Sequence, residues 1–149
     1  MAAQHECPAC RRIAAIRAGT DPFFIAELSE SFAVLHEHQA YEGWCVLLLR
    51  DHAEHLHLLP VERQQRLAGD VARAASAIAR AFSPSRINYE CLGNQMPHVH
   101  WHIIPRHLPP RDPDPCSVVW VRPPSELNRG VDPARRIRLI ETLKAAGLR

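Results

Sequence analysis

The sequence predicts an α+β fold with an antiparallel sheet of about five strands, one long helix, and shorter helices near both ends of the chain. Near the N-terminus, three short apolar segments follow one another directly, which is typical of antiparallel strands rather than of alternating strands and helices. A long segment then repeats its apolar residues every three or four positions, as a helix does. Two further strand-like segments follow this helix.

The first part of the chain predicts one helix and three strands. Residues 9–20 allow two or three helical turns that end at Gly19, because glycine is common just past a helix end. The segments FFIAEL (23–28) and FAVLHE (32–37) predict a hairpin. The continuous apolar run GWCVLLLRD (43–51) predicts a central strand covered on both faces.

The second part predicts the long helix, two more strands and an irregular segment. Residues 60–82 carry the helical repeat, and INYECLG (87–93) and HVHWHII (98–104) predict strands. Seven prolines between residues 105 and 124 exclude regular helix there. Within that segment, SVVWV (117–121) could add a short strand or pack on the core.

The composition predicts a single soluble domain. The chain has 149 residues, of which 46% are hydrophobic and 23% charged, and both fractions are near the average for globular proteins. A net charge of +2 gives no reason to expect a nucleic-acid or membrane partner. No apolar run approaches the length of a membrane span. The N-terminus lacks the layout of a signal peptide, so a cytoplasmic protein is expected.

The five cysteines are an odd number without a secretory signal, which favours reduced thiols or metal ligands over disulfides. Cys7 and Cys10 have the two-residue gap of a zinc half-site, although half a site alone leaves metal binding open. The other cysteines are expected to be small hydrophobic residues, and the three tryptophans are expected mainly to fill the core.

Three of the ten histidines, His98, His100 and His102, alternate within the predicted strand 98–104. Side chains at every second strand position share a face, so these imidazoles are expected about 6–7 Å apart on one face. Imidazole can act as a nucleophile, a proton donor or a metal ligand near neutral pH. This run therefore marks the candidate site.

Two reaction classes fit the histidine run. In one, the three imidazoles bind a metal ion that activates water. In the other, the central imidazole of His100 attacks phosphorus and forms a phosphoramidate. The spacing leaves both open, although the absence of Asp or Glu within the run disfavours the metal site. Asn94 and Gln95, just upstream, are neutral donors that would suit a phosphate.

The pattern HVHWHII resembles that of the histidine triad (HIT) family of nucleotide hydrolases and transferases. CPAC, GWCVLLLRDHAEHL, LGNQMPHVHWHIIPR and VVW follow the family's order over residues 5–122, which is the expected HIT domain. Residues 123–149 would form an extension with a helix that begins after Asp132-Pro133 and packs on or near that domain. The resemblance implies a five-stranded antiparallel sheet and a homodimer.

The resemblance also implies roles for individual residues. The central His100 would attack the α-phosphorus of a nucleotide and form a covalent nucleotidyl-histidine, while His102 would hold the phosphate and assist the leaving group. Asn94, with Gln95 beside it, would donate to a phosphate oxygen, and Asn88 is a weaker candidate for the same role. A non-catalytic nucleotide- or metal-binding module and a metal-dependent phosphohydrolase are the alternatives.

One departure from the family concerns the substrate. Many members have an aspartate that accepts from the ribose hydroxyls, and His36 stands at that position here. An imidazole can hydrogen-bond a sugar but offers no pair of acceptors. His36 is therefore an expected substrate-binding residue, and the sequence does not select the nucleotide or the leaving group.

Some bacterial members of the family complete a cysteine pair with two histidines, one after the central strand and one that opens the triad. The matching set here is Cys7, Cys10, His52 and His98, with His55 as a substitute for His52. Four protein ligands close the zinc tetrahedron, so the resemblance implies a structural zinc ion rather than a catalytic one.

Overall fold

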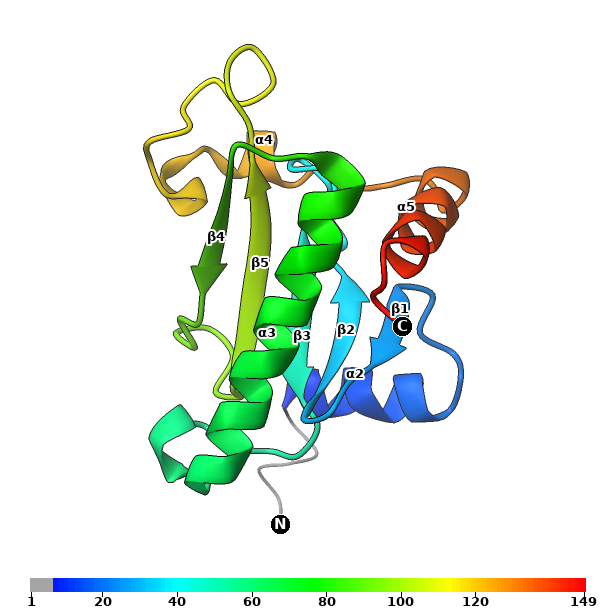
Figure 1. Cartoon of the computed structure of the whole chain (residues 1–149), viewed down its shortest axis with the longest axis vertical. Coiled ribbons are helices and arrows are strands. Elements are labelled where there is room, and N and C mark those ends of the chain that lie inside the picture. Colours follow the sequence, from blue (N-terminus) through cyan, green and yellow to red (C-terminus); the bar gives the residue numbers. More distant parts are fainter. Residues whose placement is uncertain (1–6) are drawn as a thin grey trace.

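The computed structural model describes residues 7–149 and contains a five-stranded sheet in the order β1-β2-β3-β5-β4, with every neighbouring pair antiparallel (Figure 1). The predicted α+β class is confirmed. The expected start of the domain at residue 5 lies outside the described residues. The strands are β1 (Phe24–Glu27), β2 (Ser31–Leu35), β3 (Cys45–Leu49), β4 (Arg86–Glu90) and β5 (His100–Arg106).

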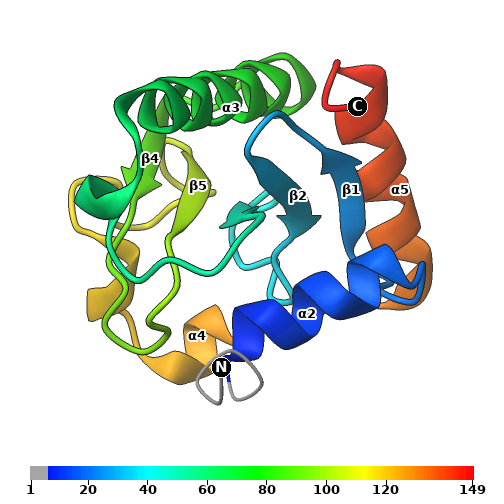
Figure 2. The same ribbon diagram turned by 90° about the horizontal axis from the view of Figure 1, so that it is seen from below.

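Helices cover both faces of the sheet. Figure 2 shows α3 and α2 on opposite sides of the strands and α5 beside β1. None of the helices in residues 7–149 is long and apolar enough to cross a membrane. The helices are α2 (Pro8–Arg17), α3 (Val61–Phe82), α4 (Pro124–Leu127) and α5 (Pro133–Ala145), with 3₁₀ turns η1 (Leu56–Leu58) and η2 (Val119–Val121).

The larger core lies between the sheet and α3 and α5. The apolar repeat of α3 places Val71 and Ile78 against Leu47 and Ile103 of the sheet, and Leu143 of α5 joins them. Burial of each such aliphatic side chain contributes about 1.5–3 kcal/mol. The terminal helix begins at a capping residue, because the side chain of Asp132 accepts from the backbone N–H of Arg135 at 2.9 Å.

A smaller core on the opposite face joins α2 to the sheet, where Ile13 and Ile16 pack with Val46 and Leu48. The register of β3 and β5 pairs Val46 with His102 and Leu48 with His100. Side chains of directly opposite residues share a face. The two imidazoles therefore lie on the α2 face, while Ile103 points into the larger core.

The loop between β2 and β3 approaches the end of α3 closely. Gly43 has a φ of +93°, and a Cβ built on it would lie 2.4 Å from the ring of Phe82. Only glycine meets both conditions without displacement of the ring.

Two details differ from the strand predictions. Residues 119–121 form the 3₁₀ turn η2, so the short strand considered for 117–121 is wrong, while the alternative of packing on the core holds for Val119. Val119 is the buried residue of that turn, and Pro123 and Pro124 follow at once, so no alternating face continues. In addition, β5 begins at His100, so His98 lies on the loop that leads into the strand.

Candidate functional site

The side chains of His100 and His102 lie next to each other on β5, with ring centroids 5.3 Å apart. His36, which follows the end of β2, is the third imidazole of this group and lies 5.7 Å from the His102 ring. The structure thus brings three of the predicted site residues together. His98 points elsewhere, into a cluster with Cys7 that is described below.

The backbone and a tryptophan give the two β5 histidines opposite hydrogen-bonding patterns. Nδ1 of His100 lies 2.6 Å from the carbonyl oxygen of His98, so this nitrogen carries the proton and donates. Nδ1 of His102 accepts from the indole N–H of Trp44 at 3.1 Å. A neutral His102 therefore carries its proton on Nε2. His100 thus offers a free Nε2 lone pair that could act as a nucleophile, and His102 beside it offers an Nε2–H that could donate to an oxygen of the group under attack.

Burial keeps two of these imidazoles neutral. It lowers the pKa of His102 to about 3, and the charges that His36 and His100 would carry when protonated act in the same direction. Burial likewise lowers the pKa of His36 to about 4, against a smaller raising effect of its hydrogen bond to the backbone of His38. The His36 ring also stacks on Trp44, with centroids 4.1 Å apart and an interplanar angle of 7°.

Two hollows meet at these histidines. The larger, about 560 Å³, extends toward α2 and is lined by Ala9, Phe23 and Leu48 in addition to the three imidazoles. The smaller, about 450 Å³, extends the other way and is lined by Leu92, Gly93, Asn94, Gln95 and Trp120. His36, His100 and His102 border both hollows, so a ligand that fills both would cross β5 at the imidazoles.

Of the three polar residues predicted to contact phosphate, two lie at the smaller hollow and one lies elsewhere. Asn94 and Gln95 border the smaller hollow. Asn88 does not line either hollow, and its side-chain oxygen accepts from Arg106 at 2.7 Å. Asn88 thus helps hold the buried Arg106 guanidinium, which also binds the carboxylate of Asp112 at 2.6 Å.

Sequence reasoning missed the polar roles of two tryptophans. Trp44 is buried, as expected, but it also fixes the proton position on His102. Trp120 is 42% exposed rather than in the core, and its ring lies 5.2 Å from that of His102, with its indole N–H bonded to Glu90. Nothing in the local sequence distinguishes these roles from core packing.

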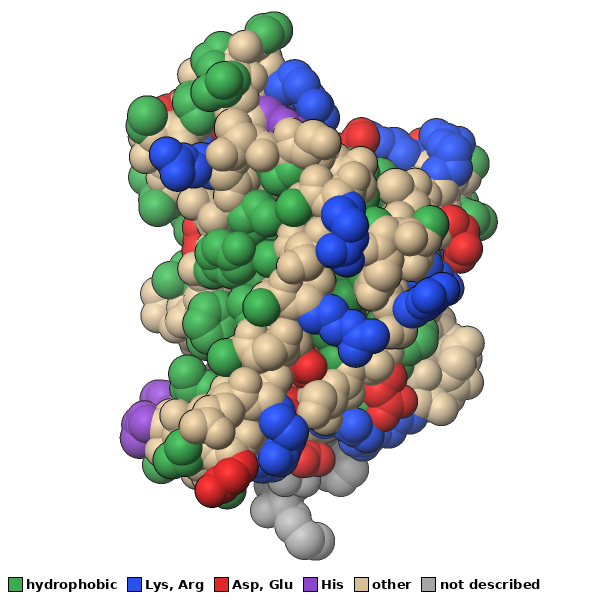
Figure 3. All heavy atoms as spheres, viewed as in Figure 1, with side chains coloured by type: hydrophobic (Ala, Val, Ile, Leu, Met, Phe, Trp, Pro, Cys, Tyr) green, Lys and Arg blue, Asp and Glu red, His purple; other side chains and the backbone are tan. Residues whose placement is uncertain are grey.

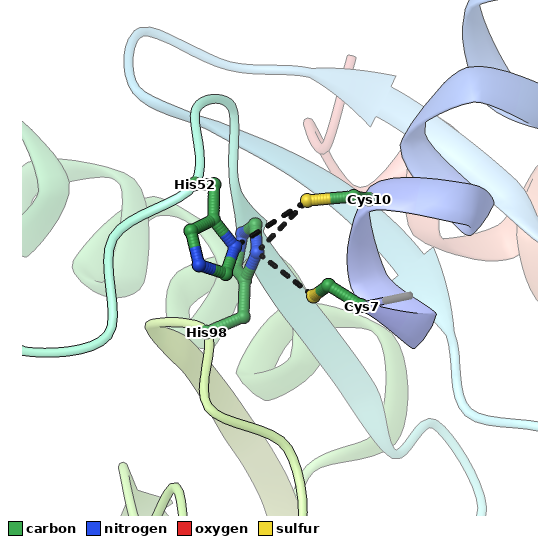
Figure 4. A group of neighbouring side chains, drawn as sticks. All are labelled: Cys7, Cys10, His52 and His98. Atoms are coloured by element: carbon green, nitrogen blue, oxygen red, sulfur yellow. Dashed lines mark hydrogen bonds between the residues drawn. The ribbon is translucent and has the colours of Figure 1, made fainter. Parts of the chain in front are cut away.

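The second cluster joins α2 to the loops around β3 and β5. Figure 4 shows the thiols of Cys7 and Cys10 pointing toward the rings of His52 and His98. The four ligand atoms lie within 4.8 Å of one another. The His98 ring is further fixed because its Nε2 lies 2.8 Å from the carbonyl oxygen of Leu49. The four residues form a possible metal site.

The distances in this cluster fit a tetrahedral ion. The sulfur of Cys10 lies 3.5 Å from Nδ1 of His52 and 3.6 Å from Nδ1 of His98, and Cys7 lies 3.6 Å from the latter atom. Zinc bonds of about 2.3 Å to sulfur and 2.0–2.1 Å to nitrogen imply tetrahedral S···N separations of about 3.6 Å. His55, the substitute considered for His52, stacks on His57 instead.

Comparisons with known proteins agree with the fold. A model of the HIT domain matches residues 18–108, which is more than half of the chain. No curated protein sequence matches the chain significantly.

Several solved structures share the fold. A histidine triad protein from Sinorhizobium meliloti has a TM-score of 0.75 at 19% identity, over 88% of this chain and 93% of that chain. One from Marinobacter aquaeolei has a TM-score of 0.73 at 22% identity, over 83% and 86%. A zinc-bound histidine triad family protein from Mycobacterium smegmatis has a TM-score of 0.64 at 21% identity, over 96% and 94%.

Proposed function

The chain belongs to the HIT domain family, and from that premise we propose that it hydrolyses or transfers a nucleotidyl group through a covalent intermediate on His100. The observation that carries this proposal is the pair of opposite hydrogen-bonding patterns on β5. The carbonyl of His98 holds the proton of His100 on Nδ1, which leaves the Nε2 lone pair free. Trp44 holds the proton of His102 on Nε2, beside that lone pair.

The proposed reaction has two steps at the α-phosphorus. Nε2 of His100 forms a bond to phosphorus while the bond from phosphorus to the leaving group breaks. The Nε2–H of His102 donates to a phosphate oxygen or to the departing atom. The adduct ring is positively charged, and the carbonyl of His98 stabilises it through the proton on Nδ1. Water or another acceptor then attacks phosphorus, and the imidazole leaves.

The two hollows suggest how a substrate would lie. The larger one has an apolar wall that includes Phe23 and Leu48, which suits a nucleoside. The smaller one has Asn94 and Gln95 for phosphate oxygens and Trp120 for the leaving group. His36 borders both, and its lowered pKa makes it a neutral hydrogen-bonding partner for the sugar at neutral pH.

A trapping experiment tests the covalent step. Wild-type protein is incubated with a nucleoside phosphoramidate and quenched in base, and we expect intact-mass spectrometry to show one added nucleotidyl group. His100→Ala is expected to show none, while His57→Ala, which removes an exposed histidine, behaves as wild type. Undiminished turnover by His100→Ala contradicts the proposal. Nucleotide binding without an adduct in any variant would support a non-catalytic module.

The metal-dependent phosphohydrolase receives less support. That reaction needs the three triad imidazoles to converge on one ion, but among the described residues only His98 joins the metal cluster. We propose that this cluster of Cys7, Cys10, His52 and His98 binds zinc in a structural role. All four positions would be filled by protein atoms, so no position stays open for water or substrate. The bound ion would tie α2 to the sheet.

A homodimer is the proposed assembly, as in the family. The strand β4 is at the edge of the sheet, and an edge strand offers unpaired backbone groups to a second chain. Figure 3 shows hydrophobic side chains gathered beside α3 on the β4 side of the molecule. Large exposed apolar residues near this edge include Tyr89 and Leu92. Sedimentation or light scattering tests this assembly directly.

A further inference from the structure

A third hollow lies away from the histidines, where the proline-rich loop after β5 meets α4. Its volume is about 210 Å³. Figure 1 shows α4 and this loop at the end of the sheet opposite to the N-terminal end of β5, where the metal cluster lies. Residues from three separate segments converge here: Tyr41 before β3, Arg111 on the loop, and Arg122, Glu126 and Arg129 around α4.

The lining of this hollow has an excess of positive charge. Of its three arginines, Arg122 pairs with Glu126, which is the one acidic residue among the lining residues. The side chains of Arg111 and Arg129 have no hydrogen-bond or ion-pair partner within residues 7–149. Two exposed guanidinium groups without a counterion among the described residues therefore border this hollow.

The carboxylate of Asp112, next to the lining residue Arg111 in the sequence, is bound to another arginine. Asp112 is buried and binds Arg106 at 2.6 Å, and that guanidinium also donates to Asn88 and to the carbonyl oxygens of Asp114 and Ser117. Asp112 therefore neutralises Arg106 rather than the lining arginines.

A buried donor without a partner completes the arrangement. Tyr41 lines the hollow and is only 6% exposed, yet its hydroxyl has no hydrogen-bond partner among the described residues. Burial, followed by the charge of Asp112, raises the pKa of Tyr41, so the hydroxyl stays protonated and can donate. The guanidinium of Arg106, which lies 5.1 Å from the centre of the Tyr41 ring, and that of Arg122 act on this pKa in the opposite direction. An unsatisfied buried hydroxyl is costly, and a ligand oxygen would satisfy it.

We propose that this hollow is a binding site for a small phosphate dianion, held by Arg111, Arg122 and Arg129 with the Tyr41 hydroxyl as an additional donor. Three arginines and one glutamate leave two net positive charges, which match the charge of hydrogen phosphate. Guanidinium groups bind phosphate oxygens in a two-pronged geometry, and Tyr41 supplies a donor from the protein interior. This site is separate from the histidines and does not depend on the function proposed for them.

The site has a built-in optical probe. The Tyr41 ring packs edge-on against Trp44, with centroids 6.1 Å apart, and Trp44 in turn contacts His102. Phosphate binding is therefore expected to change the tryptophan fluorescence, and isothermal titration calorimetry with inorganic phosphate gives the affinity independently.

Variants of the full-length protein separate this site from the active site. Arg111→Gln/Arg129→Gln is expected to weaken phosphate binding at least tenfold, and Tyr41→Phe at least threefold. Arg138→Gln removes one charge from an exposed position on α5 and is expected to bind as wild type. His100→Ala should retain the site. Equal thermal midpoints of wild type and the double variant show that the fold is intact.

Three results overturn the proposal. The first is wild-type protein that binds no phosphate under conditions where its fold is intact. The second is the double arginine variant binding phosphate as tightly as Arg138→Gln. The third is phosphate binding that disappears in His100→Ala and persists in the double variant, because the anion then occupies the active site alone.

Discussion

Acid destabilisation through His36 follows from its burial on Trp44. Its pKa is about 4 in the folded protein, against an ordinary value of 6.5. The unfolded chain therefore takes up a proton as the pH falls below 6.5, while the folded chain does so only near pH 4. The contribution of His36 to the free energy of unfolding is fully present above pH 6.5 and is lost between pH 6.5 and 4. Below pH 4 this residue causes no further loss.

The size of the effect follows from the same two values. One unit of pKa difference corresponds to about 1.4 kcal/mol, so the stability lost through protonation of His36 is at most about 3 kcal/mol. The ring is only partly buried by surface exposure, so solvent screening reduces this to about 1–3 kcal/mol. His102 changes stability in the same direction, because its pKa is about 3.

The assay compares wild type with His36→Gln by urea unfolding at steps from pH 7 to pH 4. Glutamine stays neutral, so we expect the variant to lose about 1–3 kcal/mol less than wild type over this range. Protonation of the proposed metal ligands is common to both proteins and cancels in the difference. Parallel stability curves for the two proteins would refute the reasoning, because His36 would then titrate alike in both states.

Three further outcomes are expected. Cys10→Ser should lower the zinc content, measured by metal analysis, from about one ion per chain. It should also lower the thermal midpoint in calorimetry by about 10 °C, which corresponds to roughly 3 kcal/mol of stability. The control Cys116→Ser, at an exposed cysteine, should change neither, and equal zinc contents of the two variants would contradict the site. Trp44→Phe should lower kcat about tenfold, because the proton of His102 is no longer held on Nε2. Trp101→Phe is the control, since the indole N–H of Trp101 has no partner among the described residues and lies on the other face of the sheet, and it should leave kcat unchanged. Equal losses of kcat in the two variants would contradict the role given to Trp44. Gly43→Ala should lower the free energy of unfolding by about 2–4 kcal/mol, because the new Cβ would meet the ring of Phe82. Adding Phe82→Leu to the same chain should restore part of this stability. An unchanged stability of Gly43→Ala would show that the loop can move away from the ring.

The fold could be predicted from the sequence because its signals are local. The apolar repeat of α3 and the apolar run of β3 identify their elements without reference to the rest of the chain. The exception is 117–121, where β-branched residues suggest a strand but the flanking prolines and a single buried valine give a 3₁₀ turn. The conformation of this segment depends on its tertiary surroundings, which cannot be read from the local sequence.

The candidate site was only partly predictable. Alternation along β5 placed His100 and His102 on one face, but the bond from Trp44 to His102 joins residues 58 positions apart and has no sequence signature. The arginine-lined hollow is a similar case, since Tyr41 and Arg129 meet only after the chain has folded. Such contacts depend on tertiary packing, and a single sequence does not display them.

His98 belongs to two centres at once. Its ring faces the thiols of α2, and its main-chain oxygen orients the neighbouring imidazole on β5. If this cluster binds an ion as proposed, a chelator that removes the ion would also disturb the imidazole of His100. Turnover by the proposed reaction would then fall although that reaction uses no ion. With the proposed roles, loss of activity on chelation would therefore not by itself indicate metal catalysis.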